Sequence, residues 1–194
     1  MKIPVGLSNH HIHLTREVGE ILFGKGHELT CKRDLKQVGE FACEETVDIV
    51  INGKTIEHVR LIGPYRKYTQ VELLNKDCDF FGVEQIRRNS GEVEGTLPFK
   101  LIGPVGTYEG KYGAFVAYNH IHLSESDAKD LELNAGETVE VATQDGKVIN
   151  DVHIKSDPSC SMEMHINKDE GEALGLEHVI EVTIFGKEIK YVKH

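Results

Sequence analysis

The stretch His11–Thr15 (HIHLT) occurs a second time in this chain, as His120–Ser124 (HIHLS). Each copy follows a strand-like run, Ile3–Leu7 in the first case and Tyr112–Tyr118 in the second. Each ends in Thr or Ser before an acidic stretch, which is typical of a helix N-cap. The repeat therefore predicts two related units, each with a strand that leads into a short helix.

The duplication continues downstream of these motifs. Glu45–Val50 (ETVDIV) has a counterpart in Glu137–Ala142 (ETVEVA). Asn52-Gly53 follows the first and Asp145-Gly146 the second, and both dipeptides favour tight β-hairpins. Short strands separated by glycine turns favour small barrels over a parallel sheet. We therefore expect a mainly β fold with short capping helices, in two related small β-barrel domains.

Each repeated motif offers a pair of imidazoles. Side chains two residues apart on a strand point the same way, so His11 and His13 lie side by side, as do His120 and His122. Neutral imidazole is a common ligand of zinc and other first-row metals. One such pair is more often an ordinary pair of surface histidines. Two pairs at equivalent places in a duplicated chain favour a metal centre.

Two further ligands follow from the same duplication. An offset of 93 residues matches Glu72 to His165, and both lie in segments that alternate like strands. Alone, Glu72 would be read as a solvated carboxylate and His165 as a half-buried histidine. Their equivalence predicts that each unit contributes one more ligand from the same place.

A basic loop precedes Glu72. The segment Gly63–Gln70 begins with a Gly-Pro turn and contains Arg66 and Lys67. Arg binds phosphate through two parallel hydrogen bonds, and an anionic substrate of an acidic protein needs such a group. A solvated basic loop is the alternative interpretation.

Composition limits the classes of protein that fit. The chain has 194 residues and a net charge of -10, which disfavours nonspecific nucleic-acid binding. No apolar run reaches the roughly 18–20 residues of a membrane span, so we expect a cytoplasmic protein with no membrane partner. The four cysteines form no CxxC pair and are expected to be ordinary thiols.

The ordered set of motifs resembles one known family. It comprises Ser8–Leu14, Leu61–Glu72, Arg88–Gly91, the His120/His122 pair and Met164–Glu170. Together these segments resemble the PduL-type phosphate acyltransferases, also called phosphotransacylases, over nearly the whole chain. That resemblance implies an enzyme that interconverts acyl-CoA plus phosphate and acyl phosphate plus CoA, with an acetyl or propanoyl group.

The resemblance also implies an architecture and a set of roles. It places two divalent metal ions, usually zinc, between barrel domains at residues 9–110 and 111–194, with the strand at residues 1–8 exchanged into the second. His11 and His13 would hold one metal and leave room for the coenzyme A sulfur. Arg66 would bind phosphate and act in catalysis. A homodimer is also implied. The other metal would be held by His120, His122, His165 and Glu72.

Three positions depart from the family pattern. His10 and Asn119 stand before the two motifs where the family usually has Arg, and Val105 follows a Gly-Pro turn where Lys is usual. These changes remove positive charge near the expected substrate. No extension precedes the first motif, whereas members packaged into bacterial microcompartments tend to carry one, so we expect an unpackaged form.

Three other functions remain open from the sequence. In a cupin-like metal enzyme, His11, His13 and Glu17 would be ligands, but the second cupin motif is missing. An amidohydrolase that uses the same His pair needs a (β/α)₈ barrel of about 250 residues, which is longer than this chain. A non-catalytic metal-binding or shell module would keep the histidines and have no use for Arg66.

Overall fold

The computed structural model describes residues 2–143, 145–158, 160–176 and 181–184. The chain divides into two compact units. The first unit is Asn9–Ala117, and the second consists of Met1–Ser8 together with Tyr118–His194. Each has its own hydrophobic core.

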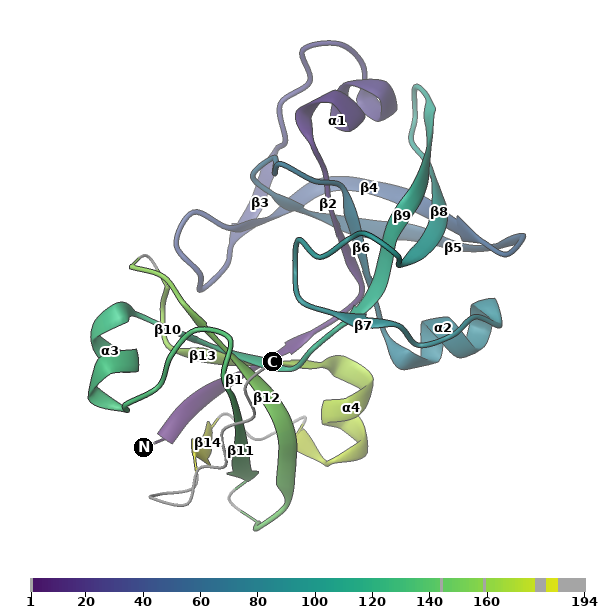
Figure 1. Ribbon diagram of the computed structural model, residues 1–194. Coiled ribbons are helices and arrows are strands. Elements are labelled where there is room, and N and C mark those ends of the chain that lie inside the picture. Colours follow the sequence, from purple (N-terminus) through teal and green to yellow (C-terminus); the bar gives the residue numbers. More distant parts are fainter. Residues whose placement is uncertain (1, 144, 159, 177–180, 185–194) are drawn as a thin grey trace. The chain divides into compact units, whose positions relative to one another are not determined.

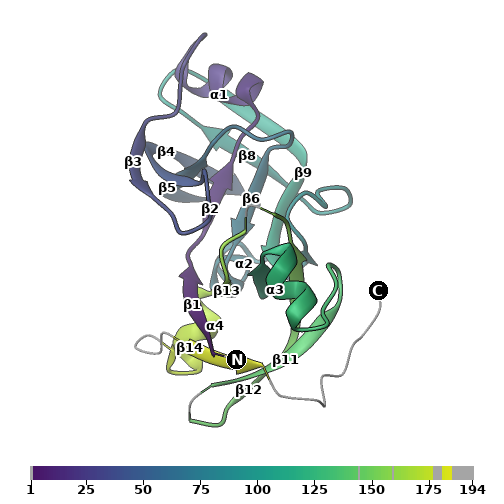
Figure 2. The same cartoon turned by 90° about the vertical axis from the view of Figure 1, so that its left-hand side faces the viewer.

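The first unit is a curled sheet with two short helices (Figure 1). Its central strands pair in the order β4-β5-β2-β6-β9, and β8 pairs with both β9 and β4, so these six strands form a ring. Helix α1 lies at one end of this unit in both views (Figure 2). The elements are β2 (His11–His13), α1 (Arg16–Phe23), β3 (Cys31–Asp34), β4 (Phe41–Ile51), β5 (Lys54–Gly63), β6 (Gln70–Leu73), α2 (Asn75–Phe81), β7 (Arg87–Arg88), β8 (Leu97–Ile102) and β9 (Thr107–Ala117).

The second unit is a closed barrel with the strand order β1-β13-β10-β12-β11-β14. Its elements are β1 (Lys2–Ser8), β10 (His120–Leu123), α3 (Glu125–Asp130), β11 (Thr138–Thr143), β12 (Val148–Ser156), β13 (Glu163–Asn167), α4 (Lys168–Ala173) and β14 (Glu181–Ile184).

The two rings share one topology. Strand β2 pairs in parallel with β5 and antiparallel with β6, and β10 does the same with β12 and β13. Strands β4 and β5 form a hairpin, as do β11 and β12. The predicted mainly β fold with two related small barrels is therefore confirmed. The hairpin at Asn52-Gly53 is confirmed too, because both residues have positive φ.

The strand that leads into each HIH motif completes the barrel of the other unit. Strand β1 precedes β2 in the chain, but it pairs with β13 and β14 (Figure 1). Strand β9 precedes β10, but it pairs with β6 and β8. The predicted domain boundary between residues 110 and 111 falls inside β9, which continues to Ala117.

Alternation along the short strands fixes where the histidines point. Ile12 and Ile121 are fully buried in the two cores, so the histidines on either side of each face away from the core. The predicted helix N-caps follow these strands. Thr15 Oγ1 accepts a hydrogen bond from Val18 N, and Ser124 Oγ accepts one from Asp127 N.

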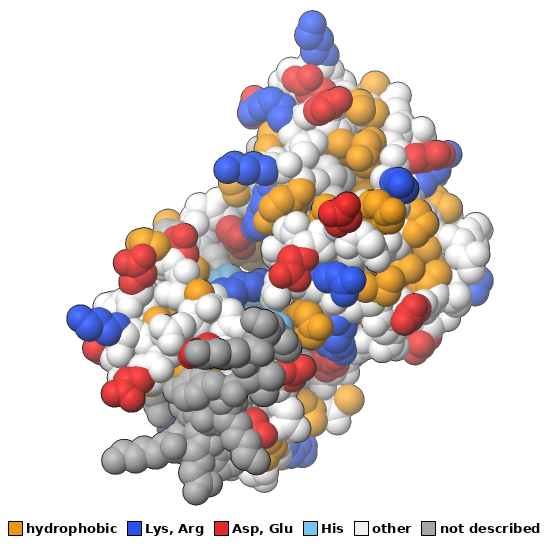
Figure 3. Space-filling view, in the orientation of Figure 1, with side chains coloured by type: hydrophobic (Ala, Val, Ile, Leu, Met, Phe, Trp, Pro, Cys, Tyr) orange, Lys and Arg blue, Asp and Glu red, His pale blue; other side chains and the backbone are white. Residues whose placement is uncertain are grey.

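Charged side chains of both signs are interspersed over the visible face of each unit (Figure 3). Within the described part of the chain, no helix is both long and apolar enough to cross a membrane.

Candidate metal centre

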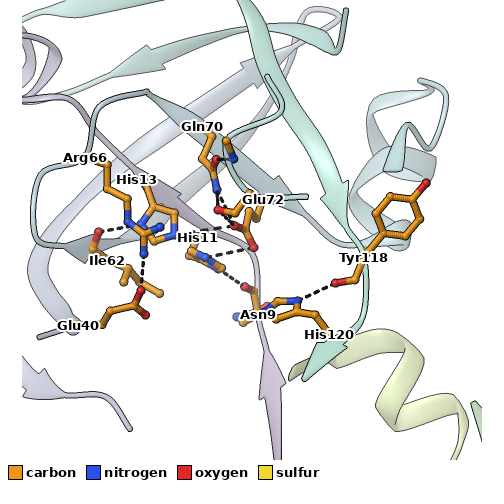
Figure 4. A network of polar contacts seen from close by, with 12 residues as sticks. Asn9, His11, His13, Glu40, Ile62, Arg66, Gln70, Glu72, Tyr118 and His120 are labelled. Carbon is orange, nitrogen blue, oxygen red and sulfur yellow. Dashed lines mark hydrogen bonds and ion pairs between the residues drawn. The ribbon is translucent and has the colours of Figure 1, made fainter. Parts of the chain in front are cut away.

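In the first unit, His11, His13 and Glu72 form what we call the first cluster. His11 lies opposite Glu72 in the pairing of β2 with β6. The distance from His11 Nε2 to Glu72 Oε2 is 3.4 Å, and that from His13 Nε2 to Glu72 Oε1 is 3.8 Å. Figure 4 shows the two imidazoles and the carboxylate converging. All three candidate ligand atoms lie within 4.8 Å of one another, so one ion could contact them together.

Backbone carbonyls set the orientation of these rings. His11 Nδ1 donates to Asn9 O at 2.8 Å, and His13 Nδ1 donates to Ile62 O at 3.1 Å. A proton held on Nδ1 leaves the Nε2 lone pair free for a metal, which is the usual arrangement behind a metal-binding histidine.

The carboxylate of Glu72 is held from its own strand and from a loop. Gln70 Nε2 donates to Glu72 Oε1 at 2.6 Å, and Ser90 Oγ donates to the same oxygen at 3.4 Å. Gln70 is itself fixed, because its Oε1 accepts a hydrogen bond from Gly91 N at 2.9 Å. The Arg88–Gly91 stretch of the family pattern therefore supports Glu72.

In the second unit, His120, His122 and His165 form the second cluster. His120 lies opposite His165 in the pairing of β10 with β13. The Nε2 atoms of His120 and His122 are 3.1 Å apart, and the ring centroids of the three histidines are 4.8 to 5.1 Å apart. Two nitrogens that bind one tetrahedral zinc ion at about 2.0 Å lie about 3.3 Å apart. The donor set therefore fits such an ion.

The contacts of His120 and His122 resemble those of the first cluster. His120 Nδ1 donates to Tyr118 O at 2.8 Å, as His11 does to its own carbonyl partner. His122 Nδ1 faces Cys160 Sγ at 3.5 Å. These contacts again direct Nε2 toward the centre of the cluster.

One histidine of each cluster is kept neutral by its surroundings. Burial, followed by the neighbouring charges of His11 and Arg66, lowers the pKa of His13 well below its ordinary value. Burial and then the Lys155 charge do the same to the pKa of His120. A neutral imidazole is the form that binds a metal ion.

Arg66 lies beside the first cluster. Its backbone N–H donates to Leu14 O at 2.7 Å, which ties the basic loop to the end of the HIH strand. Its guanidinium is bonded to the carboxylate of Glu40, and both side chains are about a quarter exposed, at 22% and 27%. Figure 4 shows this pair next to His13. Glu40 was not predicted, because no local pattern joins positions 26 residues apart.

The residues that depart from the family pattern have partners of their own. His10 Nδ1 lies 2.9 Å from Asp77 Oδ2 on α2, and Asn119 Nδ2 donates to Glu170 Oε2 on α4 at 2.7 Å. In each unit, the residue before the HIH motif thus contacts the helix that follows the second ligand strand. Val105 is exposed on the β8–β9 turn, and its N–H donates to Leu22 O.

All six predicted metal ligands lie in these two clusters. Glu72 is grouped with His11 and His13, and its expected role beside the second cluster stays a prediction. Glu17, the third ligand of the cupin-like alternative, lies exposed on α1. Gln70 and Glu163 were not predicted, although each lies two residues before a predicted ligand, on the same strand face.

Comparisons with known proteins agree on one family. The family model described as phosphate propanoyltransferase matches residues 4–177. A phosphate propanoyltransferase of Lachnoclostridium phytofermentans is 42% identical over 174 residues, which cover 88% of this chain and 81% of the relative. Those of Thermotoga maritima and Levilactobacillus brevis are each 40% identical, over 88% and 97% of this chain and 83% and 89% of their own lengths.

Proposed function

This chain belongs to the phosphate propanoyltransferase family, and on that premise we propose that it is a metal-dependent phosphate acyltransferase. It interconverts propanoyl-CoA plus phosphate and propanoyl phosphate plus CoA. The observation that carries the metal-dependent part is the presence of two ligand clusters at equivalent places in two equivalent units. Acetyl-CoA is the other substrate that the assay below has to test.

The reaction sets the requirements for the site. A phosphate oxygen attacks the thioester carbonyl, a carbon–oxygen bond forms, the carbon–sulfur bond breaks, and the sulfur leaves as a thiolate. Both reactants are anions, and the protein has a net charge of -10. Local positive charge must therefore bring them together against their repulsion.

Arg66 supplies part of this charge. In the proposed role its guanidinium binds phosphate in place of Glu40, since a phosphate oxyanion presents the same paired acceptors as a carboxylate. The loop that carries Arg66 is fixed at Leu14 O, one residue beyond the HIH strand, so the bound phosphate would be presented to the first cluster.

The clusters supply the ligands. We assign Glu72 to the first ion, because it is grouped with His11 and His13, although the resemblance alone implied the second. His11, His13 and Glu72 would then hold one divalent ion, and His120, His122 and His165 a second, with zinc favoured by the imidazole-rich set. When bound, such ions would act as Lewis acids toward the thioester oxygen and the leaving sulfur. Burial lowers the pKa of His13 and His120 and so keeps these two imidazoles neutral, and the Nδ1 contacts to carbonyls orient His11, His13 and His120.

The test is a thioester assay with purified protein. Phosphate-dependent loss of thioester absorbance from propanoyl-CoA or acetyl-CoA should be abolished by chelation and restored by zinc. Arg66→Ala should raise the KM for phosphate while zinc stays bound. Turnover that survives complete removal of metal would refute the metal-dependent part. No phosphate-dependent turnover from zinc-loaded protein would refute the enzymatic part and favour a non-catalytic module.

Three expectations about context stay predictions. These are a homodimer, a cytoplasmic location and the absence of microcompartment packaging. The mass of the native protein in solution tests the first, and fractionation of the producing cells tests the other two.

A further inference from the structure

Glu163 lies on the same face of β13 as His165, two residues before it. In the pairing with β10, His165 is opposite His120, and Glu163 is opposite His122. The four side chains therefore occupy one patch on two neighbouring strands. Met164 and Ile166, which alternate with them, are buried in the barrel core. The carboxylate of Glu163 thus faces the second cluster and not the core.

The carboxylate makes a direct contact with one predicted ligand. Glu163 Oε2 lies 2.8 Å from His165 Nε2, and the two side chains are only 14% and 22% exposed. A carboxylate can only accept here, so the imidazole N–H donates. The contact leaves the other ring nitrogen, Nδ1, without that proton and therefore able to bind a metal.

The duplicated unit has a matching contact. Gln70 lies two residues before Glu72 on β6, as Glu163 lies two residues before His165 on β13. In the pairing of β6 with β2, Gln70 is opposite His13, which is the place that Glu163 takes opposite His122. Gln70 Nε2 donates to Glu72 Oε1 at 2.6 Å.

The chemistry of the two contacts is complementary. Where the ligand is a carboxylate, Glu72, the supporting side chain is an amide that can donate to it. Where the ligand is an imidazole, His165, the supporting side chain is a carboxylate that can accept from it. Two positions related by the duplication thus carry the group that their own ligand requires, which a chance surface contact would not explain.

Gly6 leaves room for the second of these pairs. It lies opposite His165 in the pairing of β1 with β13. A Cβ at this position would be 3.1 Å from Glu163 Oε1 and 3.4 Å from His165 Cδ2. The first distance is shorter than an ordinary van der Waals contact, whereas the second is an ordinary contact, so a side chain here would press on the Glu163 carboxylate beside His165.

From these contacts we propose that Glu163 is a positioning residue for His165, and that Gln70 has the same role for Glu72. The proposal rests on the metal-dependent function above. Glu163 fixes the ring orientation and the protonated nitrogen of His165. Partners of this kind typically change metal affinity by about 10–100-fold when they are removed.

Zinc affinity, measured by competition with a chromophoric chelator, tests the proposal without reference to turnover. Glu163→Ala should lower the zinc affinity of one of the two sites by about 10–100-fold. Glu163→Gln, whose amide oxygen can still accept from His165, should weaken it less. Glu140→Gln is the control, because it makes the same change on β11, a strand that does not pair with β10 or β13. It should leave both affinities unchanged.

Ligand deletions then assign the effect to one cluster. In a His120→Ala background, one zinc ion should remain, and adding Glu163→Gln should not alter its affinity, whereas adding Gln70→Ala should weaken it. In a His11→Ala background the two effects should be reversed. Gly6→Ala should lower the zinc affinity of the second cluster without removing any polar atom.

The outcomes separate this proposal from the proposed function. Wild-type protein that binds two zinc ions, with affinities unchanged in Glu163→Ala, would overturn the positioning role and leave the function standing. Weakening of both sites by Glu163→Gln would indicate a general structural role and overturn it too. A changed visible spectrum of the Co²⁺-loaded Glu163→Gln protein would indicate direct ligation instead of positioning. Wild-type protein that binds no zinc would refute both proposals.

Discussion

Replacement of Gly19 by Ala should weaken both the fold and the phosphate site, because of one aromatic ring. Gly19 lies in the middle of α1, and a Cβ there would be 2.4 Å from Tyr65 Cε1 and Oη. Tyr65 directly precedes Arg66, and its hydroxyl donates to His27 O at 3.0 Å. The ring would have to move, and the loop that carries Arg66 would move with it.

The size of the effect follows from three contributions. Overpacking of this kind costs about 1–3 kcal/mol. Loss of the bond from Tyr65 to His27 O costs about 0.5–1.5 kcal/mol more. The better helix propensity of Ala offsets about 1 kcal/mol. We expect the free energy of unfolding to fall by about 2 kcal/mol.

Urea denaturation measures the loss of stability. The KM for phosphate measures the change at the phosphate site and should rise. Glu17→Ala on the exposed face of the same helix is the control, and its effect should stay within about 0.5 kcal/mol. In a Tyr65→Leu background, which removes the atoms that Cβ would meet, Gly19→Ala should be neutral or stabilising by up to about 1 kcal/mol. An unchanged loss of stability in that background would refute the reasoning.

Three other predictions follow from contacts described above. Glu40→Gln should lower the KM for phosphate by up to about fivefold, because a pair with Arg66 that is about a quarter exposed stabilises by about 1 kcal/mol at most. Glu44→Gln is the control, and a raised KM would mean that Glu40 orients Arg66. Burial raises the pKa of the Cys43 thiol from 9.0 to about 12, because the folded protein favours the neutral thiol over the thiolate. The contribution of the neutral thiol to the free energy of unfolding is therefore complete below pH 9 and is lost as the pH rises toward 12. Between pH 8 and pH 10 the wild type should therefore lose about 1.4 kcal/mol more unfolding free energy than Cys43→Val, and parallel pH profiles would contradict this. Removal of zinc should lower the unfolding free energy by about 2.7 kcal/mol for each site when zinc had been present at 100 times its Kd, and equal melting curves with and without chelator would exclude such binding.

The duplication, with its short strands and glycine turns, was sufficient to predict two related small barrels, and the repeated HIH motif fixed one strand face in each. Ile12 and Ile121 had to face the cores, so the histidines had to face away from them. The offset of 93 residues predicted that Glu72 and His165 are equivalent, and the structure shows that each lies on a strand that pairs with an HIH strand. The structure places all six side chains in two clusters, although their binding of metal ions stays a proposal.

The partners of these residues were harder to predict, since they depend on contacts between distant segments. The bond between Arg66 and Glu40 joins residues that flank the two ends of the β4–β5 hairpin. Gln70 and Glu163 could have been found, because strand periodicity puts each beside a predicted ligand.

His10 and Asn119 illustrate a different difficulty. From sequence, both residues were interpreted as a loss of positive charge near a substrate, whereas they contact Asp77 and Glu170 on helices of their own units. An Arg at either position could pair with the same carboxylate, and His or Asn keeps a hydrogen bond there. Residue type alone did not reveal that partner.

The position of β1 has a consequence for the order in which the protein can fold during synthesis. Lys2–Ser8 is translated before the first unit, but its partners, β13 and β14, begin at Glu163 and Glu181. The first unit has all its strands once Ala117 has left the ribosome, so it can close early. The second unit must keep β1 unpaired until β13 and β14 have been made, and such long-range pairing is slow. During that interval unpaired strand edges of the second unit are open to other chains, which makes the nascent protein prone to aggregation until β14 has been made.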